Sequence, residues 1–421
     1  MKYIKKKCDS FNLHMIKTDK FKTITIELMF SNEIKKEEIT KTNFLSSALC
    51  YTTKKYPTKI VFARQLEDLY SAKIFPTCYR LGNNYNVDIN MTLLNDRYSE
   101  KGLLKKTLSF LKEVVFNPNI TNNVLDEDTF NVVKNDELSQ IERLKEDPRK
   151  KSILKLYEMV DKDAKYALNT DGYIEDLEKI NRNNICDYYK EFLNKSVIDL
   201  YIVGDLDFDD TYKMVKEMFI FDKTERLNKE FIISEKKHNK KIVEFSEKDN
   251  TNQAKLSIAC TIEGLTDYER KYVLSLYNFI LGGSADSKFF KNIREKYSLC
   301  YYVSSVGNKL DNIMLITSGI TKDNYKKIMI LIKKEMGDMV KGNFTEEDIE
   351  KAKTYYLSNM EEIEDNPHQI IASYYAIDNI GVDDLERRKE KYSKVTKEEI
   401  MAIAKKIFLD TAFLLGGDKK W

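Results

Sequence analysis

The side chains best suited to hold a catalytic metal are few and scattered in this sequence. The chain has three histidines, His14, His238 and His368, and no two of them are spaced to share one face of a helix. Two imidazoles one helical turn apart, with a glutamate between them, would bind zinc and deprotonate a metal-bound water. The six cysteines include no C-x-x-C pair and predict neither a thiolate zinc site nor a disulfide framework. We therefore expect no metal or other cofactor in this chain.

The elements that must position any site follow two clear hydrophobic patterns. Apolar residues alternate with polar ones in the segments 24–30, 85–93 and 256–262, which is typical of half-buried strands. Apolar residues recur three and four positions apart in 104–115 and 325–336, which predicts amphipathic helices. These patterns predict an α+β protein in which helices cover sheets.

The length and net charge of the chain predict its number of domains and argue against some classes of partner. A chain of 421 residues is too long for one ordinary core and predicts two or three domains. Lysine and arginine (70) nearly balance aspartate and glutamate (68), and the net charge of +2 argues against nucleic acid or a membrane surface as a partner. No apolar run reaches the length of about 18 residues that a membrane span needs, and the N-terminal segment has no apolar stretch of signal-peptide length. We expect a cytoplasmic protein.

Several segments in the second half of the chain resemble segments in the first half. LSQIERLKEDP at 138–148 and LSNMEEIEDNP at 357–367 share Leu, Ser and Pro without a gap, 219 positions apart. The segments that begin at 180 and 395 also match in their polar start and apolar spacing, and in the second of them Thr396 and Glu399 predict a capping box. We predict two copies of one domain. The first covers 1–222, a lysine-rich linker covers 223–241, and the second covers 242–421.

The segment NFLSSALCYTTKKYP, residues 43–57, predicts a short apolar helix that runs into a Tyr-Pro stop. Together with the duplication, it resembles the pitrilysin/insulinase family of zinc peptidases, the inverzincins, and the resemblance extends over nearly the whole chain. The motif of that family, H-x-x-E-H, lies on this helix. Its three functional positions are Asn43, Ser46 and Ser47 here, which supply neither imidazole nor a base. We interpret the helix as retained for packing after its metal site was lost.

This resemblance has two further implications. It implies two homologous α+β domains, each a mainly antiparallel sheet covered by helices, the fold of LuxS and the processing peptidases. It also places the family's third zinc ligand, a glutamate, near Asp136 or Glu137. An isolated carboxylate cannot hold zinc, and we interpret this position as a solvated charge on a helix.

The segment FILGGSADSKFFKNIREKYSLCYYVSS, residues 279–305, carries the chemistry that remains. It resembles the family's glycine-containing loop, and the resemblance maps an Arg and a Tyr, donated by the half without zinc, onto Arg294 and Tyr301. A phenol there would donate a hydrogen bond to the scissile carbonyl as it becomes an oxyanion, and a guanidinium would bind main chain or a carboxylate. The loop residues predicted to contact an extended peptide are Gly282, Gly283, Ser284 and Ser287.

Structural alternatives stand beside these roles. Arg294 would then form an ordinary ion pair, Tyr301 would pack in the core, and Gly282 would only end a helix. A phosphate loop is a weaker interpretation of the glycines, because no Gly-Lys-Ser/Thr follows them.

The resemblance implies a non-catalytic subunit of a heterodimeric zinc peptidase. A related chain with H-x-x-E-H would supply zinc and base, and the two chains would close as a clam-shell around an unfolded peptide. The alternative is an inactive scaffold or peptide-binding protein of the same fold with no hydrolytic partner, for which a homodimer would fit. An autonomous metallopeptidase is the third and least favoured interpretation.

Overall fold

The computed structural model describes residues 1–222, 231, 233, 235–251 and 253–416, and it divides into two compact units. The first unit consists of 1–143, 169–231 and 363–379, and the second of 144–168, 232–362 and 380–421. The sequence duplication predicts one boundary, at the linker. Each compact unit, however, also includes a segment from the other half of the chain. Residues 223–230, 232 and 234 of that linker lie outside the described residues.

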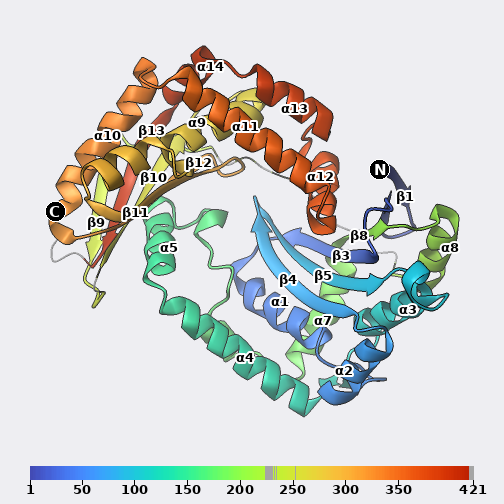
Figure 1. Ribbon diagram of the computed structural model, residues 1–421. Helices are drawn as coiled ribbons and strands as arrows, with labels where there is room; N and C mark the ends of the chain where they lie inside the picture. The colour runs from blue at the N-terminus through green and yellow to red at the C-terminus, as the bar shows by residue number, and fades with distance from the viewer. Residues whose placement is uncertain (223–230, 232, 234, 252, 417–421) are drawn as a thin grey trace. The chain divides into compact units, whose positions relative to one another are not determined.

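The first unit is built on a six-stranded sheet in the order β1-β2-β8-β3-β5-β4 (Figure 1). All neighbouring strands are antiparallel except β2 and β8. The strands are β1 (Lys2–Lys7), β2 (Asn12–Lys17), β3 (Thr23–Glu33), β4 (Lys73–Leu81), β5 (Asn84–Leu94) and β8 (Val197–Gly204), with a small separate hairpin of β6 (Ile120–Thr121) and β7 (Val124–Leu125). The helices are α1 (Lys36–Leu49), α2 (Lys59–Asp68), α3 (Leu103–Phe116), α4 (Glu127–Lys145), α6 (Ile174–Leu177), α7 (Asn184–Lys195), α8 (Phe208–Met218) and α12 (Pro367–Ile380).

The second unit is built on a five-stranded sheet in the order β11-β12-β10-β13-β9. Its one parallel pair is β13 with β9. The strands are β9 (Val243–Glu247), β10 (Ala254–Ile262), β11 (Cys300–Asn308), β12 (Ile313–Ile320) and β13 (Ile407–Leu415). The α-helices are α5 (Pro148–Val160), α9 (Leu274–Asn278), α10 (Tyr325–Lys341), α11 (Glu346–Ile363), α13 (Leu385–Lys394) and α14 (Lys397–Ala404), and π-helical turns cover Glu269–Val273, Phe279–Gly283 and Phe290–Lys296.

The two sheets have the same topology once β1 is set aside. Reading β2-β8-β3-β5-β4 beside β9-β13-β10-β12-β11 matches the strands one by one, and the single parallel pair falls at the same place in each. The predicted fold, two homologous domains with mainly antiparallel sheets covered by helices, is confirmed. The predicted capping box of Thr396 and Glu399 is also present, at the start of α14.

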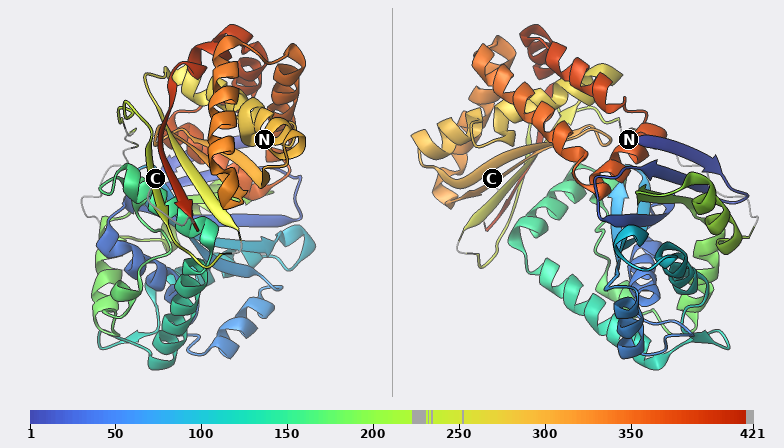
Figure 2. Two further views of the ribbon diagram at one scale, coloured as in Figure 1. Left: turned by 90° about the vertical axis from the view of Figure 1, so that its left-hand side faces the viewer. Right: turned by 45° about the vertical axis from the view of Figure 1, so that its right-hand side comes forward.

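Each sheet buries both of its faces because strand residues alternate between two cores. In the first unit, Ile26, Leu28 and Phe30 of β3 belong to a large core shared with the helices of the first half. Met29 of the same strand packs on the other side with Ile371 of α12. In the second unit the corresponding face is covered by α5, where Leu156, Val160, Ala259, Phe413 and Leu415 form one cluster. Figure 2 shows α12 against the first sheet from two sides.

The exchanged helices explain the repeated Pro-containing segment in the sequence. α4 ends at Lys145 and α5 starts at Pro148, just as α11 ends at Ile363 and α12 starts at Pro367. Proline lacks the N–H of an interior helix position and suits the first turn of a new helix. No helix among the described residues is long and apolar enough to cross a lipid bilayer.

Candidate functional site

The helix with the degenerate motif, α1, packs its apolar residues into the core of the first unit. Phe44, Leu45 and Leu49 are buried there. The motif positions Asn43 and Ser46 are buried as well, and Ser47 is half-buried. The packing role predicted for this helix matches these positions.

Asn43 is held by hydrogen bonds on both ends of its amide. Its Nδ2 donates to the carbonyl oxygen of Thr170 at 3.0 Å, and its Oδ1 lies 2.5 Å from the Tyr85 hydroxyl. The same hydroxyl is 2.8 Å from the Thr170 carbonyl oxygen, and burial raises the pKa of Tyr85. The first motif position therefore ties α1 to β5 and to the chain after α5.

Ser46 is the residue that the resemblance places at the family's catalytic base. Its Oγ donates to the carbonyl oxygen of Asn43 at 2.8 Å and lies 3.2 Å from Sγ of Cys78, on the edge strand β4. Burial raises the pKa of the Cys78 thiol to about 12. At neutral pH this thiol is therefore protonated.

Ser47 contacts the carboxylate at the position implied for the third zinc ligand. Its Oγ donates to Oε1 of Glu137, on α4, at 2.7 Å. Glu137 is only 6% exposed, whereas Asp136 beside it is exposed. Burial raises the pKa of Glu137, the Ser47 hydrogen bond lowers it, and the charge of Asp136 raises it. The interpretation of this carboxylate as a solvated helix charge holds for Asp136 and is wrong for Glu137.

The three histidines are hydrogen-bonded far from this helix in sequence. His14 is buried in β2, with Nε2 3.0 Å from Asp199 and Nδ1 2.8 Å from the Tyr3 hydroxyl. His368 pairs with Glu27, and His238 lies 2.8 Å from Glu263. Within the described ranges, no group of three or more His, Cys, Asp or Glu side chains is placed to hold a metal ion.

The second candidate region lies around β11, an edge strand of the second sheet. Tyr301 is 69% exposed and stands at a break in the β11–β12 register, where Cys300 pairs with Ile320 and Tyr302 with Gly319. Such a bulge redirects the side chain of its extra residue. Arg294, at the end of the preceding π-helical turn, is exposed and lies over the Phe290 ring at 4.6 Å.

These two side chains are close to the same point of the strand. The charge of Arg294 lowers the pKa of Cys300, which burial raises, so the guanidinium lies near the residue next to Tyr301. Among the described residues, no hydrogen bond or ion pair joins Arg294 or Tyr301 to another side chain. The core and ion-pair alternatives therefore do not describe this part of the structure, and the catalytic roles stay predictions.

The predicted loop residues divide into two pairs. Gly282 is buried, and a Cβ there would lie 2.5 Å from the Phe289 ring and 2.6 Å from Ser305 Oγ. Ser287 is buried too, and its Oγ accepts from the Phe290 N–H at 3.4 Å. Packing thus accounts for these two. Gly283 is exposed and Ser284 is half-buried, so these two are the accessible ones, and their contact with peptide stays a prediction.

Sequence reasoning did not find the residues that fill the degenerate site from other elements. Tyr85 belongs to a strand whose alternation predicts burial but not contact with α1, and no pattern in the sequence predicted the strand that holds Cys78. Glu137 lies in a polar stretch of α4 and carried no signal of burial. The resemblance alone pointed to its position.

Comparison with known proteins agrees with this geometry. The family model of the inactive domain of M16 peptidases matches residues 179–356. The protein of Bacillus subtilis (strain 168) named probable inactive metalloprotease YmfF is 27% identical over 425 residues, which cover 98% of this chain and 97% of that protein. An uncharacterized zinc protease of Rickettsia bellii (strain RML369-C) is 25% identical over 230 residues, 53% of each chain.

Solved structures extend the comparison to the whole fold. A conserved protein from Enterococcus faecalis V583 superposes with a TM-score of 0.92 at 26% identity, covering 100% of this chain and 99% of the other. A peptidase M16 inactive domain from Pseudomonas fluorescens superposes with a TM-score of 0.80 at 17% identity, again over 100% and 99% of the two chains. The second likeness is one of fold alone.

Proposed function

We propose that the chain is an inactive member of the pitrilysin-type M16 peptidase family and the non-catalytic subunit of a two-chain zinc peptidase. Its partner is a related chain that carries H-x-x-E-H. We place the pair in the cytoplasm, where it acts on unfolded peptides.

One observation carries this proposal: Tyr301 is 69% exposed at a bulge of an edge strand. An exposed phenol adds little to the stability of the fold. A bulge that redirects such a side chain is a feature often found beside active sites. The degenerate motif shows the opposite, since Asn43, Ser46 and Ser47 all bond within the first unit.

The chemistry proposed for this chain is binding and charge stabilisation. β11 offers an unpaired edge to an extended peptide, which adds as a further strand. The Tyr301 hydroxyl donates to the scissile carbonyl oxygen as negative charge develops on it, and the Arg294 guanidinium binds a substrate carboxylate or main-chain carbonyl. Zinc in the partner activates the attacking water.

The test is to mix the purified chain with its zinc-bearing relative. We expect a stable heterodimer in size-exclusion chromatography with light scattering, and cleavage of unstructured peptides that neither chain achieves alone. If the relative cleaves at the same rate with and without this chain, the subunit proposal fails and the scaffold interpretation replaces it. Stoichiometric zinc and peptidase activity in the isolated chain would contradict both.

A further inference from the structure

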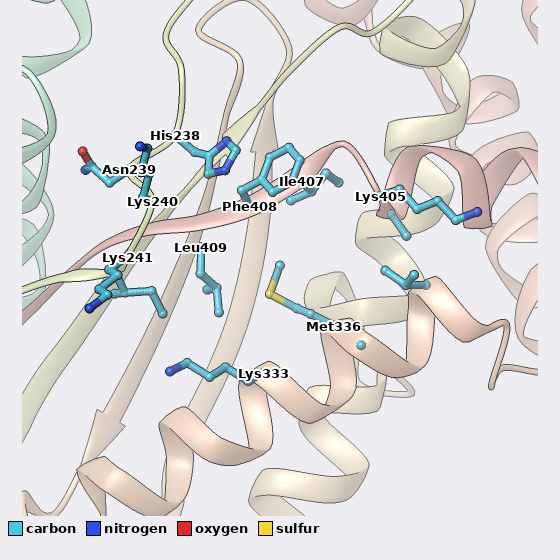
Figure 3. Close-up of a pocket in the computed structure, with 14 residues that line it drawn as sticks. His238, Asn239, Lys240, Lys241, Lys333, Met336, Lys405, Ile407, Phe408 and Leu409 are labelled. Atoms are coloured by element: carbon cyan, nitrogen blue, oxygen red, sulfur yellow. The ribbon is translucent and has the colours of Figure 1, made fainter.

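A pocket in the second unit, unrelated to the predicted site residues, combines an apolar floor with a basic rim. It has a volume of about 430 Å³ and lies between the start of β13, helix α10 and the segment before β9 (Figure 3). Met336 and Leu409 form part of the floor, and Figure 3 shows them between α10 and β13.

The charge of the lining is entirely positive. Four lysines and no aspartate or glutamate line the pocket; the lysines are Lys240, Lys241, Lys333 and Lys405. In Figure 3, Lys241 and Lys333 come from opposite walls toward one end, whereas Lys405 lies at the other end. Within the described part of the chain, none of the four forms an ion pair, whereas Lys334 and Lys406, each next to one of them in sequence, pair with Asp338 and Glu269.

The wall formed by residues 238–242 is anchored and does not depend on a ligand. The His238 ring stacks on Phe408 with centroids 3.9 Å apart, and its Nδ1 lies 2.8 Å from Glu263. The backbone N–H of Asn239 donates to Asp410 at 2.7 Å. Glu263 and Asp410 therefore anchor this wall to the rest of the second unit.

At this pocket the ladder between β9 and β13 ends, and the anchored segment 238–242 lies beside the start of β13. β9 pairs with β13 only from Thr411 to Leu415, so on this side no described strand pairs with residues 407–410. On the other side, Ile407, Phe408 and Leu409 pair with β10.

We propose that this pocket binds an extended acidic peptide in which carboxylates alternate with apolar residues. The carboxylates pair with Lys241 and Lys333, and the apolar side chains cover Met336 and Leu409. Charge complementarity selects the occupant, because the rim offers only cations and the floor only apolar surface.

The probe is a fluorescein-labelled peptide of sequence Glu-Leu-Asp-Leu-Glu-Leu, measured by fluorescence anisotropy with the whole chain in the absence of any zinc-bearing partner. We expect binding that weakens as salt rises, because these charges are solvent-exposed. A Gln-Leu-Asn-Leu-Gln-Leu peptide binds at least tenfold more weakly. The double variant Lys241→Glu/Lys333→Glu also binds the acidic peptide at least tenfold more weakly than the wild type.

The matched control is Lys326→Glu/Lys327→Glu, which makes the same change in charge on exposed residues of α10 that do not line the pocket. It keeps wild-type affinity within twofold, and thermal unfolding verifies that both double variants are folded. Equal binding of the neutral peptide, or equal losses in the two double variants, would overturn the proposal. So would binding of phosphatidylglycerol vesicles through Lys241 and Lys333 without binding of the peptide. Since the zinc-bearing partner is absent from this assay and Tyr301 is unchanged in both double variants, its failure would leave the proposed function untouched.

Discussion

Two equivalent corners of the duplicated fold differ in how their polar side chains are used. In the first unit, helix α1 packs on edge strand β4; in the second, helix α9 and the turn after it pack on edge strand β11. Around α1, Asn43, Ser46 and Ser47 bond to buried groups of neighbouring elements. Around β11, Arg294 and Tyr301 are exposed.

The polar side chains of the two corners therefore differ in how much they contribute to the stability of the fold. A buried polar group that has a partner adds modestly to stability, and removing the partner leaves an unsatisfied group that costs more. An exposed Tyr or Arg without a polar partner adds little to the fold. The first corner has thus become part of the core of its unit, and the second is available to another molecule.

The largest effect is expected from restoring the lost motif. The variant Asn43→His/Ser46→Glu/Ser47→His places two imidazoles one turn apart beside Glu137, which already lies within hydrogen-bond distance of position 47. We expect it to bind about one zinc ion per chain, measured by elemental analysis after dialysis against micromolar zinc, where the wild type binds none.

The control for restoration removes the proposed third ligand. Adding Glu137→Gln to the triple variant should weaken zinc binding at least tenfold. A folded triple variant that binds no zinc would contradict the interpretation of positions 43, 46 and 47 as a lost metal site. The comparison between the two corners would then no longer hold for the first unit.

A smaller effect is expected on stability. Asn43→Ala leaves the Tyr85 hydroxyl and the Thr170 carbonyl with one partner fewer, and we expect a loss of about 1–3 kcal/mol in the free energy of unfolding. Arg294→Ala removes only an exposed contact with Phe290 and should cost less than about 1 kcal/mol. Urea unfolding of both variants measures these losses. A larger loss for Arg294→Ala than for Asn43→Ala would contradict the difference described between the two corners.

The smallest effect concerns the pH dependence of stability. Because burial raises the pKa of Glu137 in the folded state, folding favours the protonated carboxyl, and this residue costs stability as pH rises through its folded pKa. Glu137→Gln keeps an oxygen acceptor for Ser47 and is never ionised. Its stability relative to wild type should therefore increase from pH 4 to pH 8.

Glu142→Gln, an exposed position on the same helix, provides the comparison and should show no such trend. A Glu137→Gln variant whose relative stability falls with rising pH would mean that the carboxylate is stabilised in its ionised form.

Local patterns predicted the elements well because burial leaves a period in the sequence. The strands expected at 24–30, 85–93 and 256–262 lie in β3, β5 and β10, and the helices expected at 104–115 and 325–336 lie in α3 and α10. Periodicity says which face of an element is apolar but not which sheet that face will meet. The exchange of α5 and α12 between the units therefore could not be predicted from it.

The site was predictable in its positions and not in its contacts. The motif positions on α1 and the carboxylate near 137 were placed by resemblance, whereas the burial of Glu137 depends on how α4 packs on α1. Likewise, the bulge at Tyr301 arises from the pairing of β11 with β12, which the residues of β11 alone do not specify.

The central claim is that this chain contributes Tyr301 to a site completed by a zinc-bearing partner. The most direct measurement is the rate of peptide cleavage by the mixed chains with Tyr301→Phe, beside Tyr297→Phe as a matched change at another exposed tyrosine of the same segment. Loss of one oxyanion donor predicts a fall of about a hundredfold or more in kcat for Tyr301→Phe and none for Tyr297→Phe. A mixture that cleaves at the wild-type rate with Tyr301→Phe would contradict the claim.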